Sequence, residues 1–336
     1  ENEMKHPTLR RTFITAVAAL AVGAVTGFAQ AQTVTMHAAT QFNDDHDYNR
    51  TLKRFGELVT KYYGKPVEVV IHGNSELGVE RDYAKFMNQG ISVDVSILAG
   101  SNMSNFTKAA PLLDVPFVFR DRAHWNAVIA KNGMKPLFDI IEQQSGMEVI
   151  GICGGSTRHL IANKPMRNMK ELAGYKIRVI GAPIQGKIFS AFGAKPSVIA
   201  YNEVYNAIQS GVIEGLENEA PAVLNSKFYE VAPEISLTTH AVVTRLLVVS
   251  GKSMKKYPAD LQAAIRKAGA EAGAFNREIQ AREDQGAMDK MVAEKKARTH
   301  VFTERDKLLS ISKPIVAEFA KEAGVDRILA DMQALK

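Results

Sequence analysis

Cysteine is almost absent from this chain. Its 336 residues include a single one, Cys153, so no disulfide can form within the chain. Cys153 lies in an apolar run at residues 149–153, and we predict a buried strand residue rather than a nucleophile. Without disulfides the chain depends on its hydrophobic core, and its length suffices for two domains.

Catalytic and membrane-spanning signatures are absent too. The sequence has no HExxH pair, no G-x-S-x-G elbow, no P-loop and no G-x-G-x-x-G. Beyond residue 31 no stretch is long and apolar enough to cross a bilayer. We therefore expect no catalytic residues and no cofactor, and we predict that the protein is not an enzyme.

Basic residues do not gather into a nucleic-acid surface. The formal charge is +6, yet lysines and arginines are spread among carboxylates, with no basic run that carries interleaved aromatics. We expect no nucleic-acid partner, whereas a modest positive field attracts anionic solutes. The cluster Asp44-Asp45-His46-Asp47 lacks the ligand spacing of a metal site, so we expect no metal. His46 follows the first strand and is a candidate to line a cleft.

The N-terminus has the pattern of a secretory signal peptide. Basic residues precede an apolar segment at residues 13–28, and Ala29-Gln30-Ala31 has the small-residue pattern of a cleavage site. An uncleaved anchor is the alternative, but the apolar segment is short for a membrane span. We predict that residues 1–31 are removed and that the mature protein, starting at Gln32, lies in the periplasm.

The remaining sequence predicts an α/β fold. Apolar, β-branched runs predict strands at residues 33–38, 67–71, 93–98, 149–153, 177–180, 212–216 and 242–250. Helical periodicity predicts helices at residues 48–63, 83–88 and 123–144. Strands that alternate with helices indicate largely parallel sheets.

One long helix is predicted at residues 258–296. Apolar residues recur there every three or four positions from Leu261 to Ile279, with charged residues off the stripe. Such a helix exceeds the length of one small domain, so it can run along two. A coiled-coil dimer is the alternative, which alanines and glycines in the stripe disfavour.

The most informative stretch contains two arginines, Arg158 and Arg178. Arg178 lies in the strand expected at residues 177–180, where its planar guanidinium can be held rigidly and bind a carboxylate through two parallel hydrogen bonds. Salt bridges within the fold are the alternative role of both arginines. The stretch implies a protein that captures a small organic anion without transforming it.

These segments together resemble the substrate-binding protein of a tripartite ATP-independent periplasmic (TRAP) transporter. The resemblance covers residues 33–336 and rests on the order and spacing of several motifs. They are ELGVER at 76–81, LDVPFVF at 113–119, STR at 156–158, KELAGYKIRV at 170–179, FGAKP at 192–196, YNEVYNAIQSG at 201–211 and EGLEN at 214–218.

The resemblance implies a set of ligand-binding residues. The arginine at the position of Arg178 binds the ligand carboxylate and Arg158 assists it, while Asn218 hydrogen-bonds the same region and Tyr201 packs on it. For these last two, helix capping and core packing are the alternative roles. Glu80, in the first motif, and His46 complete the predicted site. In place of the proline that often follows the arginine-valine pair, this chain has Ile180-Gly181, so the adjacent loop can differ in shape.

The resemblance also implies a two-domain periplasmic-binding-protein fold with a hinge and a long helix that spans both domains. We expect domain I at residues 32–155 plus 244–283, and domain II at residues 156–243 plus 284–336. The protein is expected to be a monomer that delivers its ligand to integral membrane permease subunits. For Arg245 we expect a solvated or inter-domain ion pair, with a second anionic ligand group as the alternative.

The identity of the acid stays open at this point. Asn, Thr and Gln near the site favour hydroxyl groups, so we expect a sugar acid such as a uronate or an aldonate. C4-dicarboxylates, 2-oxo acids and aromatic acids are the alternatives. A secreted enzyme acting on carboxylates or a secreted adhesion protein would be a different class altogether.

Overall fold

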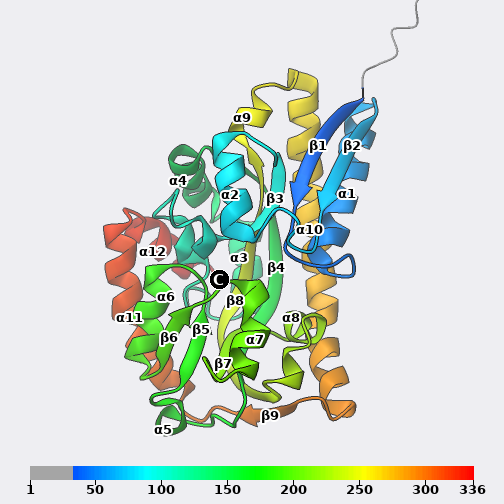
Figure 1. The fold of residues 1–336 in the computed structure, drawn as a ribbon. Helices are drawn as coiled ribbons and strands as arrows, with labels where there is room; N and C mark the ends of the chain where they lie inside the picture. Colours follow the sequence, from blue (N-terminus) through cyan, green and yellow to red (C-terminus); the bar gives the residue numbers. More distant parts are fainter. Residues whose placement is uncertain (1–32) are drawn as a thin grey trace, which may run out of the picture. The chain divides into compact units, whose positions relative to one another are not determined.

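The computed structural model describes residues 33–336, so the predicted signal peptide lies outside the described residues (Figure 1). One sheet of nine strands runs through this part, in the order β2-β1-β3-β8-β4-β7-β5-β6, with β9 paired to β8. The strands are β1 (Val34–Ala39), β2 (Val67–His72), β3 (Val95–Ala99), β4 (Met147–Ala162), β5 (Lys176–Val179), β6 (Lys195–Val198), β7 (Gly215–Glu219), β8 (Glu234–Ser250) and β9 (Arg298–Val301).

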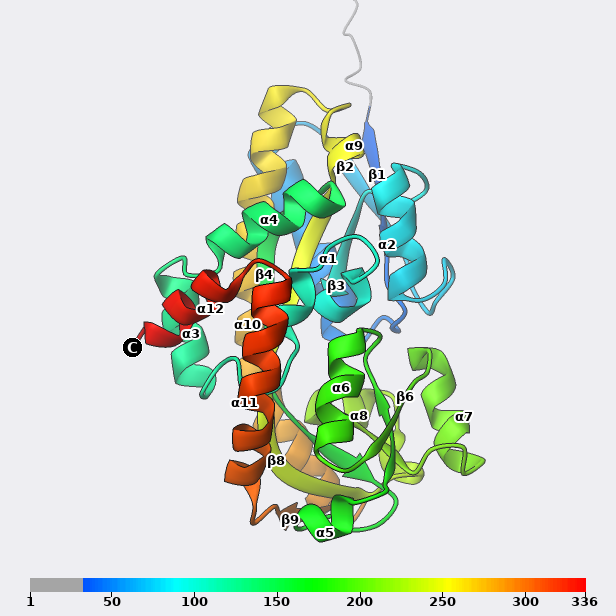
Figure 2. The same cartoon turned by 90° about the vertical axis from the view of Figure 1, so that its left-hand side faces the viewer.

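Helices flank the sheet, which confirms the α/β prediction for the described residues. They are α1 (Asp47–Tyr63), α2 (Glu80–Gln89), α3 (Arg122–Ala130), α4 (Lys135–Ser145), α5 (Met169–Leu172), α6 (Pro183–Ala191), α7 (Val204–Gln209), α8 (Ala220–Asn225), α9 (Gly251–Met254), α10 (Ala259–Ala293), α11 (Arg305–Glu322) and α12 (Asp326–Ala334). Short 3-10 turns complete the fold at Gly100–Met103, Ala110–Leu113, Tyr201–Glu203 and Phe228–Glu230. Figure 2 shows α11 beside α6, which it also contacts.

Neighbouring strands pair in parallel at each end of the sheet, whereas those at its centre pair antiparallel. β1 is parallel to β2 and β3, and β5 is parallel to β6 and β7. Between these groups β8 runs antiparallel to β3 and β4, and β4 runs antiparallel to β7. The prediction of largely parallel sheets is therefore wrong for the centre. Apolar periodicity identifies strands but carries no information on their direction.

β4 and β8 are longer than the apolar runs that predicted them. The strands expected at residues 149–153 and 242–250 extend to Met147–Ala162 and Glu234–Ser250. The extensions include buried polar residues such as Arg158 and His240. These residues are satisfied by partners inside the protein, so hydrophobic periodicity could not reveal the strand around them.

The helix expected at residues 123–144 is two helices, α3 and α4. The chain turns between them at Asn132, whose φ is +53°. Asn tolerates this left-handed conformation better than most residues, and Gly133 follows it. The single-helix prediction is wrong because the apolar pattern continues across the turn.

The long helix α10 confirms the prediction at residues 258–296 to within a few residues at each end. Its 35 residues give a length of about 52 Å. Figure 1 shows it running alongside α1 and on toward β9, and it contacts both elements. Its first half packs through Leu261 and Ile265 into one hydrophobic cluster with α1, and its second half packs through Met288 and Met291 into another with α7 and α8.

A polar stripe on α10 separates these two clusters. Its members, Asn276, Gln280 and Asp284, are four residues apart and so share one helix face. Each accepts a backbone N–H of β4: Asn276 Oδ1 from Gly154 at 2.8 Å, Gln280 Oε1 from Ser156 at 3.3 Å and Asp284 Oδ2 from Thr157 at 3.0 Å.

The stripe compensates an irregularity in β4. The pairing of β4 with β8 shifts register between Gly154 and Thr157, so these N–H groups leave the regular ladder. Gly154 has φ +109°, and a Cβ there would lie 2.1 Å from the carbonyl oxygen of Val243, so this position requires glycine. The amides of Asn276 and Gln280 also donate to Asp47 Oδ2, at 2.7 and 2.9 Å, which ties the start of α1 to the same point.

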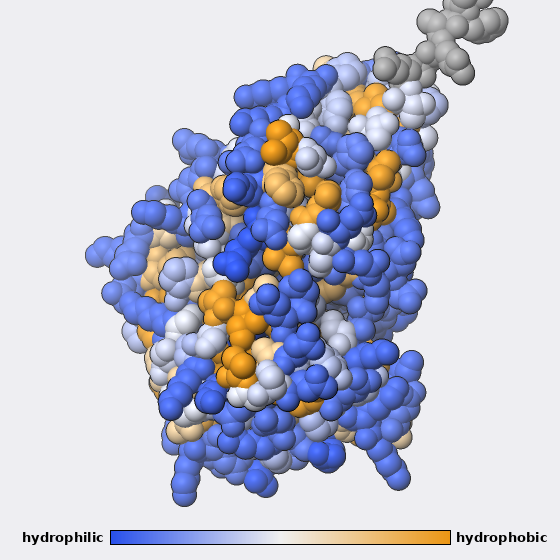
Figure 3. Space-filling model, viewed as in Figure 1, coloured by the Kyte–Doolittle hydropathy of each residue, from blue (hydrophilic) through white to orange (hydrophobic). Residues whose placement is uncertain are grey.

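Large exposed hydrophobic residues are few on the described surface. Figure 3 shows a face that is hydrophilic around its edges, with hydrophobic residues gathered nearer the middle. The large hydrophobic side chains that are most exposed lie singly on separate elements, as is usual for a protein surface. They are Ile91, Val198, Val212, Val292, Val301 and Leu309.

We predict that Asn276→Ala lowers the free energy of unfolding by about 2–3 kcal/mol, because it leaves the Gly154 N–H unpaired and removes a donor from the buried Asp47 carboxylate. Gln285→Ala, which truncates an exposed amide on the same helix, is the matched control and should change it by less than about 0.5 kcal/mol. Urea unfolding of both variants measures this. Equal effects would contradict the structural role of the stripe.

Candidate ligand-binding site

A small polar cavity lies next to the neighbouring strands β8, β4 and β7, each of which contributes lining residues. Its volume is about 30 Å³, room for two or three water molecules. The lining side chains come from both ends of the sheet and are mostly polar or charged. They are Gln41, Phe42, Tyr48, Glu80, Ala99, Asn102, Arg158, Arg178, Ile180, Tyr201, Asn218, Glu219, Ala222 and Arg245.

Arg178 is a buried cation without a carboxylate partner. It projects from the short strand β5, is 6% exposed, and donates from Nε to the Ile199 carbonyl oxygen at 3.0 Å. Among residues 33–336, neither Nη atom of Arg178 has a hydrogen-bond partner. Burial lowers the pKa of this guanidinium, although arginine stays charged in proteins. Arg178 is therefore a buried cation whose two Nη groups have no hydrogen-bond partner in residues 33–336, an arrangement that favours an anionic ligand.

Arg158, in contrast, is paired on every side. Its Nε donates to Glu217 Oε2 at 2.5 Å, its Nη2 to Glu217 Oε1 at 2.9 Å, and its Nη1 to Glu219 Oε2 at 2.5 Å. Burial alone would raise the pKa of Glu217, but Arg158 and His240 lower it to about 2. Arg158 lines the cavity while its charge is compensated within the protein, unlike that of Arg178.

Asn218 and Tyr201 form a second polar unit. Asn218 lies within β7, and its Nδ2 donates to Tyr201 Oη at 3.4 Å. Tyr201 Oη in turn contacts Ser226 Oγ at 3.0 Å, and the tyrosine ring lies 5.7 Å from the Arg178 guanidinium carbon. The Tyr201 ring thus lies beside Arg178, and its hydroxyl positions the Asn218 side-chain amide beside the cavity.

Glu80 brings a carboxylate to the cavity from the start of α2. It is the first residue of α2, and its Oε2 accepts the Ala99 N–H at 2.8 Å and Asn102 Nδ2 at 2.8 Å. Burial raises the pKa of Glu80, an effect that the nearby Arg245 and the two donors oppose. Its Oε1 accepts only a long hydrogen bond of 3.5 Å from Gln41 Nε2, so this oxygen keeps capacity to accept another.

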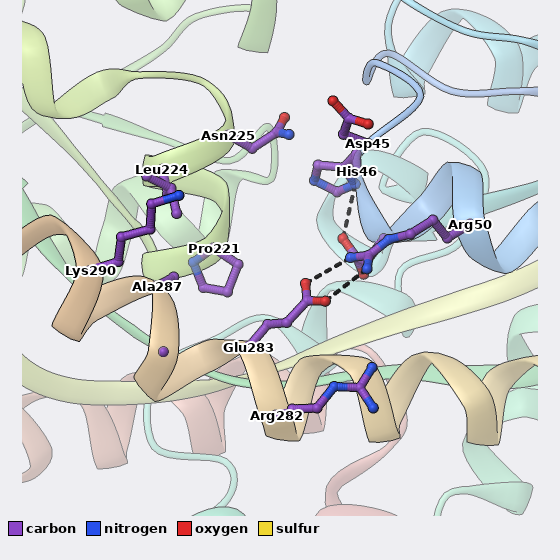
Figure 4. Close-up of a pocket in the computed structure, with 12 residues that line it drawn as sticks. Asp45, His46, Arg50, Pro221, Leu224, Asn225, Arg282, Glu283, Ala287 and Lys290 are labelled. Atoms are coloured by element: carbon purple, nitrogen blue, oxygen red, sulfur yellow. Dashed lines mark hydrogen bonds and ion pairs between the residues drawn. The ribbon is translucent and has the colours of Figure 1, made fainter.

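His46 does not line this cavity. It caps α1, where its Nδ1 accepts the Tyr48 N–H at 3.2 Å, and its ring stacks on Phe42 with centroids 3.6 Å apart. Phe42 itself lines the cavity. His46 instead lines a larger hollow of about 320 Å³ between the start of α1, α8 and α10, in which Arg50 and Glu283 form a bidentate ion pair (Figure 4).

The structure thus brings five of the six predicted site residues to one cavity: Arg178, Arg158, Asn218, Tyr201 and Glu80. Sequence reasoning missed Glu217 and Glu219, although a signal was available. Residues two apart on a strand share a face, and Glu219 lies opposite Arg158 in the register of β4 and β7. Tyr48 and Phe42 were missed because contacts between distant segments place them in the wall.

Comparison with known proteins identifies the family. The profile of the bacterial extracellular solute-binding protein family 7 matches residues 38–322, and the chain belongs to this family. A solute-binding protein of Sulfitobacter sp. (strain NAS-14.1) is 46% identical over 94% of this chain and 96% of its own length. The 2,3-diketo-L-gulonate-binding periplasmic protein of Escherichia coli (strain K12) is 27% identical over 76% of each chain.

Solved structures agree with this assignment. A TRAP periplasmic solute-binding protein from Sulfitobacter sp. NAS-14.1, solved with bound α-D-taluronate, superposes with a TM-score of 0.87 at 45% identity, over 90% of this chain and 98% of the other. The protein is therefore a TRAP solute-binding protein with the two-domain fold of its structural neighbours, a transport protein and not an enzyme.

The family assignment also bears on partners and compartment. TRAP solute-binding proteins are periplasmic and bind small organic acids, which implies membrane permease subunits as partners. None of the helices in residues 33–336 is long and apolar enough to cross a membrane. Within the same residues no group of His, Cys, Asp and Glu is arranged to hold a metal ion.

Proposed function

We propose that this protein captures a six-carbon sugar acid, with the ligand carboxylate bound by the two Nη atoms of Arg178, and delivers it to TRAP permease subunits. The observation that carries the proposal is the buried guanidinium of Arg178, which has no carboxylate partner in residues 33–336 and borders a polar cavity. A ligand carboxylate supplies the missing counter-charge in a geometry that matches the arginine fork.

The other polar groups of the cavity favour hydroxyls over a second carboxylate. Glu80 and Glu219 both line it, and each has an oxygen free to accept a hydrogen bond from a hydroxyl. A second carboxylate would meet these two acidic side chains and be repelled. This disfavours a C4-dicarboxylate.

The relatives support the same ligand class. The Sulfitobacter structure at 45% identity contains α-D-taluronate, and the Escherichia coli relative is named for 2,3-diketo-L-gulonate. Both compounds are six-carbon sugar acids. Combined with the cavity's acceptors, these ligands favour a hexuronate or a related sugar acid for this chain.

Ligand entry requires the walls to separate, because a cavity of about 30 Å³ is too small for a six-carbon acid. We propose two lobes, residues 32–155 plus 244–283 and residues 156–243 plus 284–336, which close around the ligand. Glu80 and Arg245 then lie on one lobe, and Arg178, Asn218 and Tyr201 on the other. The polar stripe of α10 lies at the boundary and acts as the pivot.

We also propose that residues 1–31 are a cleaved signal peptide and that the mature protein acts as a monomer. The apolar segment at residues 13–28 and the Ala29-Gln30-Ala31 pattern support cleavage before Gln32. The permease partners of this family support the same compartment, because the permease receives its ligand from the periplasm.

Arg178→Ala should weaken binding of the cognate hexuronate by at least about 100-fold, which corresponds to about 3 kcal/mol, because the ligand carboxylate is then buried without a partner. Arg178→Lys should recover only part of the loss, since an ammonium group lacks the fork. Titration calorimetry with D-galacturonate, D-glucuronate and D-taluronate measures this. Arg282→Ala, on the exposed side of α10, is the control. Unchanged affinity in Arg178→Ala would refute the proposed role.

Ligand should both stabilise the protein and make it more compact. At a concentration about a hundredfold above Kd, binding contributes about 2.7 kcal/mol to the free energy of unfolding, or several degrees in Tm. Small-angle scattering should then show a smaller radius of gyration than without ligand. A rise in Tm with no change in scattering would leave ligand binding intact and contradict lobe closure.

The exported protein should begin at Gln32. Expression of the complete chain in a Gram-negative host, followed by N-terminal sequencing of the periplasmic fraction, tests this. Recovery of an uncleaved chain from the membrane fraction would show that residues 13–28 serve as an anchor instead.

A further inference from the structure

A third arginine, Arg245, lines the cavity from a different strand than Arg178. It lies on β8, opposite Ala99 of β3 and Cys153 of β4 in the sheet register, and is 5% exposed. Arg178 projects from β5, near the far end of the same sheet. The two guanidinium groups therefore approach the cavity from different strands, and a single ligand carboxylate bound to Arg178 leaves Arg245 facing another part of the ligand.

Only one nitrogen of the Arg245 guanidinium, Nη1, donates hydrogen bonds to described residues of the protein. Its Nη1 donates to Asp114 Oδ1 at 2.7 Å and to the Thr244 carbonyl oxygen at 3.0 Å. Asp114 is itself fixed, because its Oδ2 accepts the Ser101 N–H at 2.6 Å. Among the described residues, Nε and Nη2 of Arg245 have no hydrogen-bond partner, so the group is held rigidly with two nitrogens available at the cavity.

Acceptor groups line the same cavity as these donors. Glu80 Oε1 has only its long contact with Gln41, and Glu219 Oε1 has no partner within residues 33–336. The Tyr48 hydroxyl, on a side chain that is 4% exposed, also lines the cavity without a partner in this part of the chain. A sugar hydroxyl donates one hydrogen bond and accepts others, so it requires an acceptor and a donor side by side.

The local charge disfavours an anionic group at this end. Asp114 already compensates Arg245, and Glu80 and Glu219 add negative charge around it. Burial alone would lower the pKa of Arg245, but Tyr48, Asp114, Glu219 and Glu80 together raise it well above its ordinary value. A second carboxylate placed here would meet the carboxylates of Glu80 and Glu219 beside an arginine that Asp114 already pairs, whereas a neutral hydroxyl carries no charge to be repelled.

We propose that Arg245 is a specificity-determining residue, which donates from Nε and Nη2 to hydroxyl oxygens at the end of the ligand remote from its carboxylate, while Glu80 and Glu219 accept from the same hydroxyls. The proposal rests on the proposed function, in which Arg178 binds the carboxylate. It makes the site selective for polyhydroxy monoacids over both unsubstituted acids and sugar diacids.

The test compares three ligands by titration calorimetry. They are the tightest-binding hexuronate of the panel above, tetrahydropyran-2-carboxylate, which keeps ring and carboxylate but has no hydroxyls, and D-glucarate, which has a carboxylate at each end. The wild type should prefer the hexuronate over either comparison ligand by more than about 100-fold. In Arg245→Gln the preference over tetrahydropyran-2-carboxylate should fall at least tenfold, while the affinity for tetrahydropyran-2-carboxylate itself changes less than about threefold.

Arg245→Lys keeps a positive charge beside Asp114, so it serves as the variant in which the fold is preserved. Its preference for the hexuronate over tetrahydropyran-2-carboxylate should fall as well. An equal loss of affinity for all three ligands in both variants would show a purely structural role and overturn the proposal. So would a wild type that prefers D-glucarate over the hexuronate, because Arg245 would then bind a carboxylate. If no hexuronate binds the wild type but another acid does, the proposed function itself is wrong.

Discussion

The ligand site depends on a difference between two buried arginines: within residues 33–336, Arg158 is paired with carboxylates of the protein, and Arg178 is not. Arg158 has its charge compensated by Glu217 and Glu219, whereas Arg178 has only a backbone carbonyl as partner within the described residues. Leaving a buried charge unpaired is costly, so the fold must hold it in place by other means. In the proposed two-lobe mechanism, the free energy released when an anion pairs with Arg178 favours the closed arrangement of the lobes over the open one.

The long helix α10 connects this site to the rest of the molecule. It contributes to two separate hydrophobic clusters, and between them its polar stripe binds the irregular segment of β4 that leads to Arg158. Because Asn276 and Gln280 also bind Asp47, α1 and β4 meet at the same point. In the proposed two-lobe mechanism this point is the pivot, because hydrogen bonds rather than close hydrophobic packing join the elements there.

The sequence predicted the elements that have strong local signals. The α10 stripe from Leu261 to Ile279 and the strand around Arg178 were found because apolar periodicity marks them directly. The antiparallel centre of the sheet and the full lengths of β4 and β8 were not, since direction and register depend on contacts between distant residues. For the same reason the sequence could indicate that Arg158 and Arg178 matter but not that only Arg178 lacks a carboxylate partner. His46 lines the larger hollow between α1, α8 and α10 and not the polar cavity around Arg178, a distinction that depends on contacts between distant segments.

The most direct test of the central claim is a crystal structure of the mature protein with its tightest-binding hexuronate. Both oxygens of the ligand carboxylate should lie within about 3 Å of the two Nη atoms of Arg178, with Arg158 still paired to Glu217 and Glu219. A ligand carboxylate bound to Arg245 instead, or a ligand that leaves the Arg178 Nη atoms without an anionic partner, would contradict this claim.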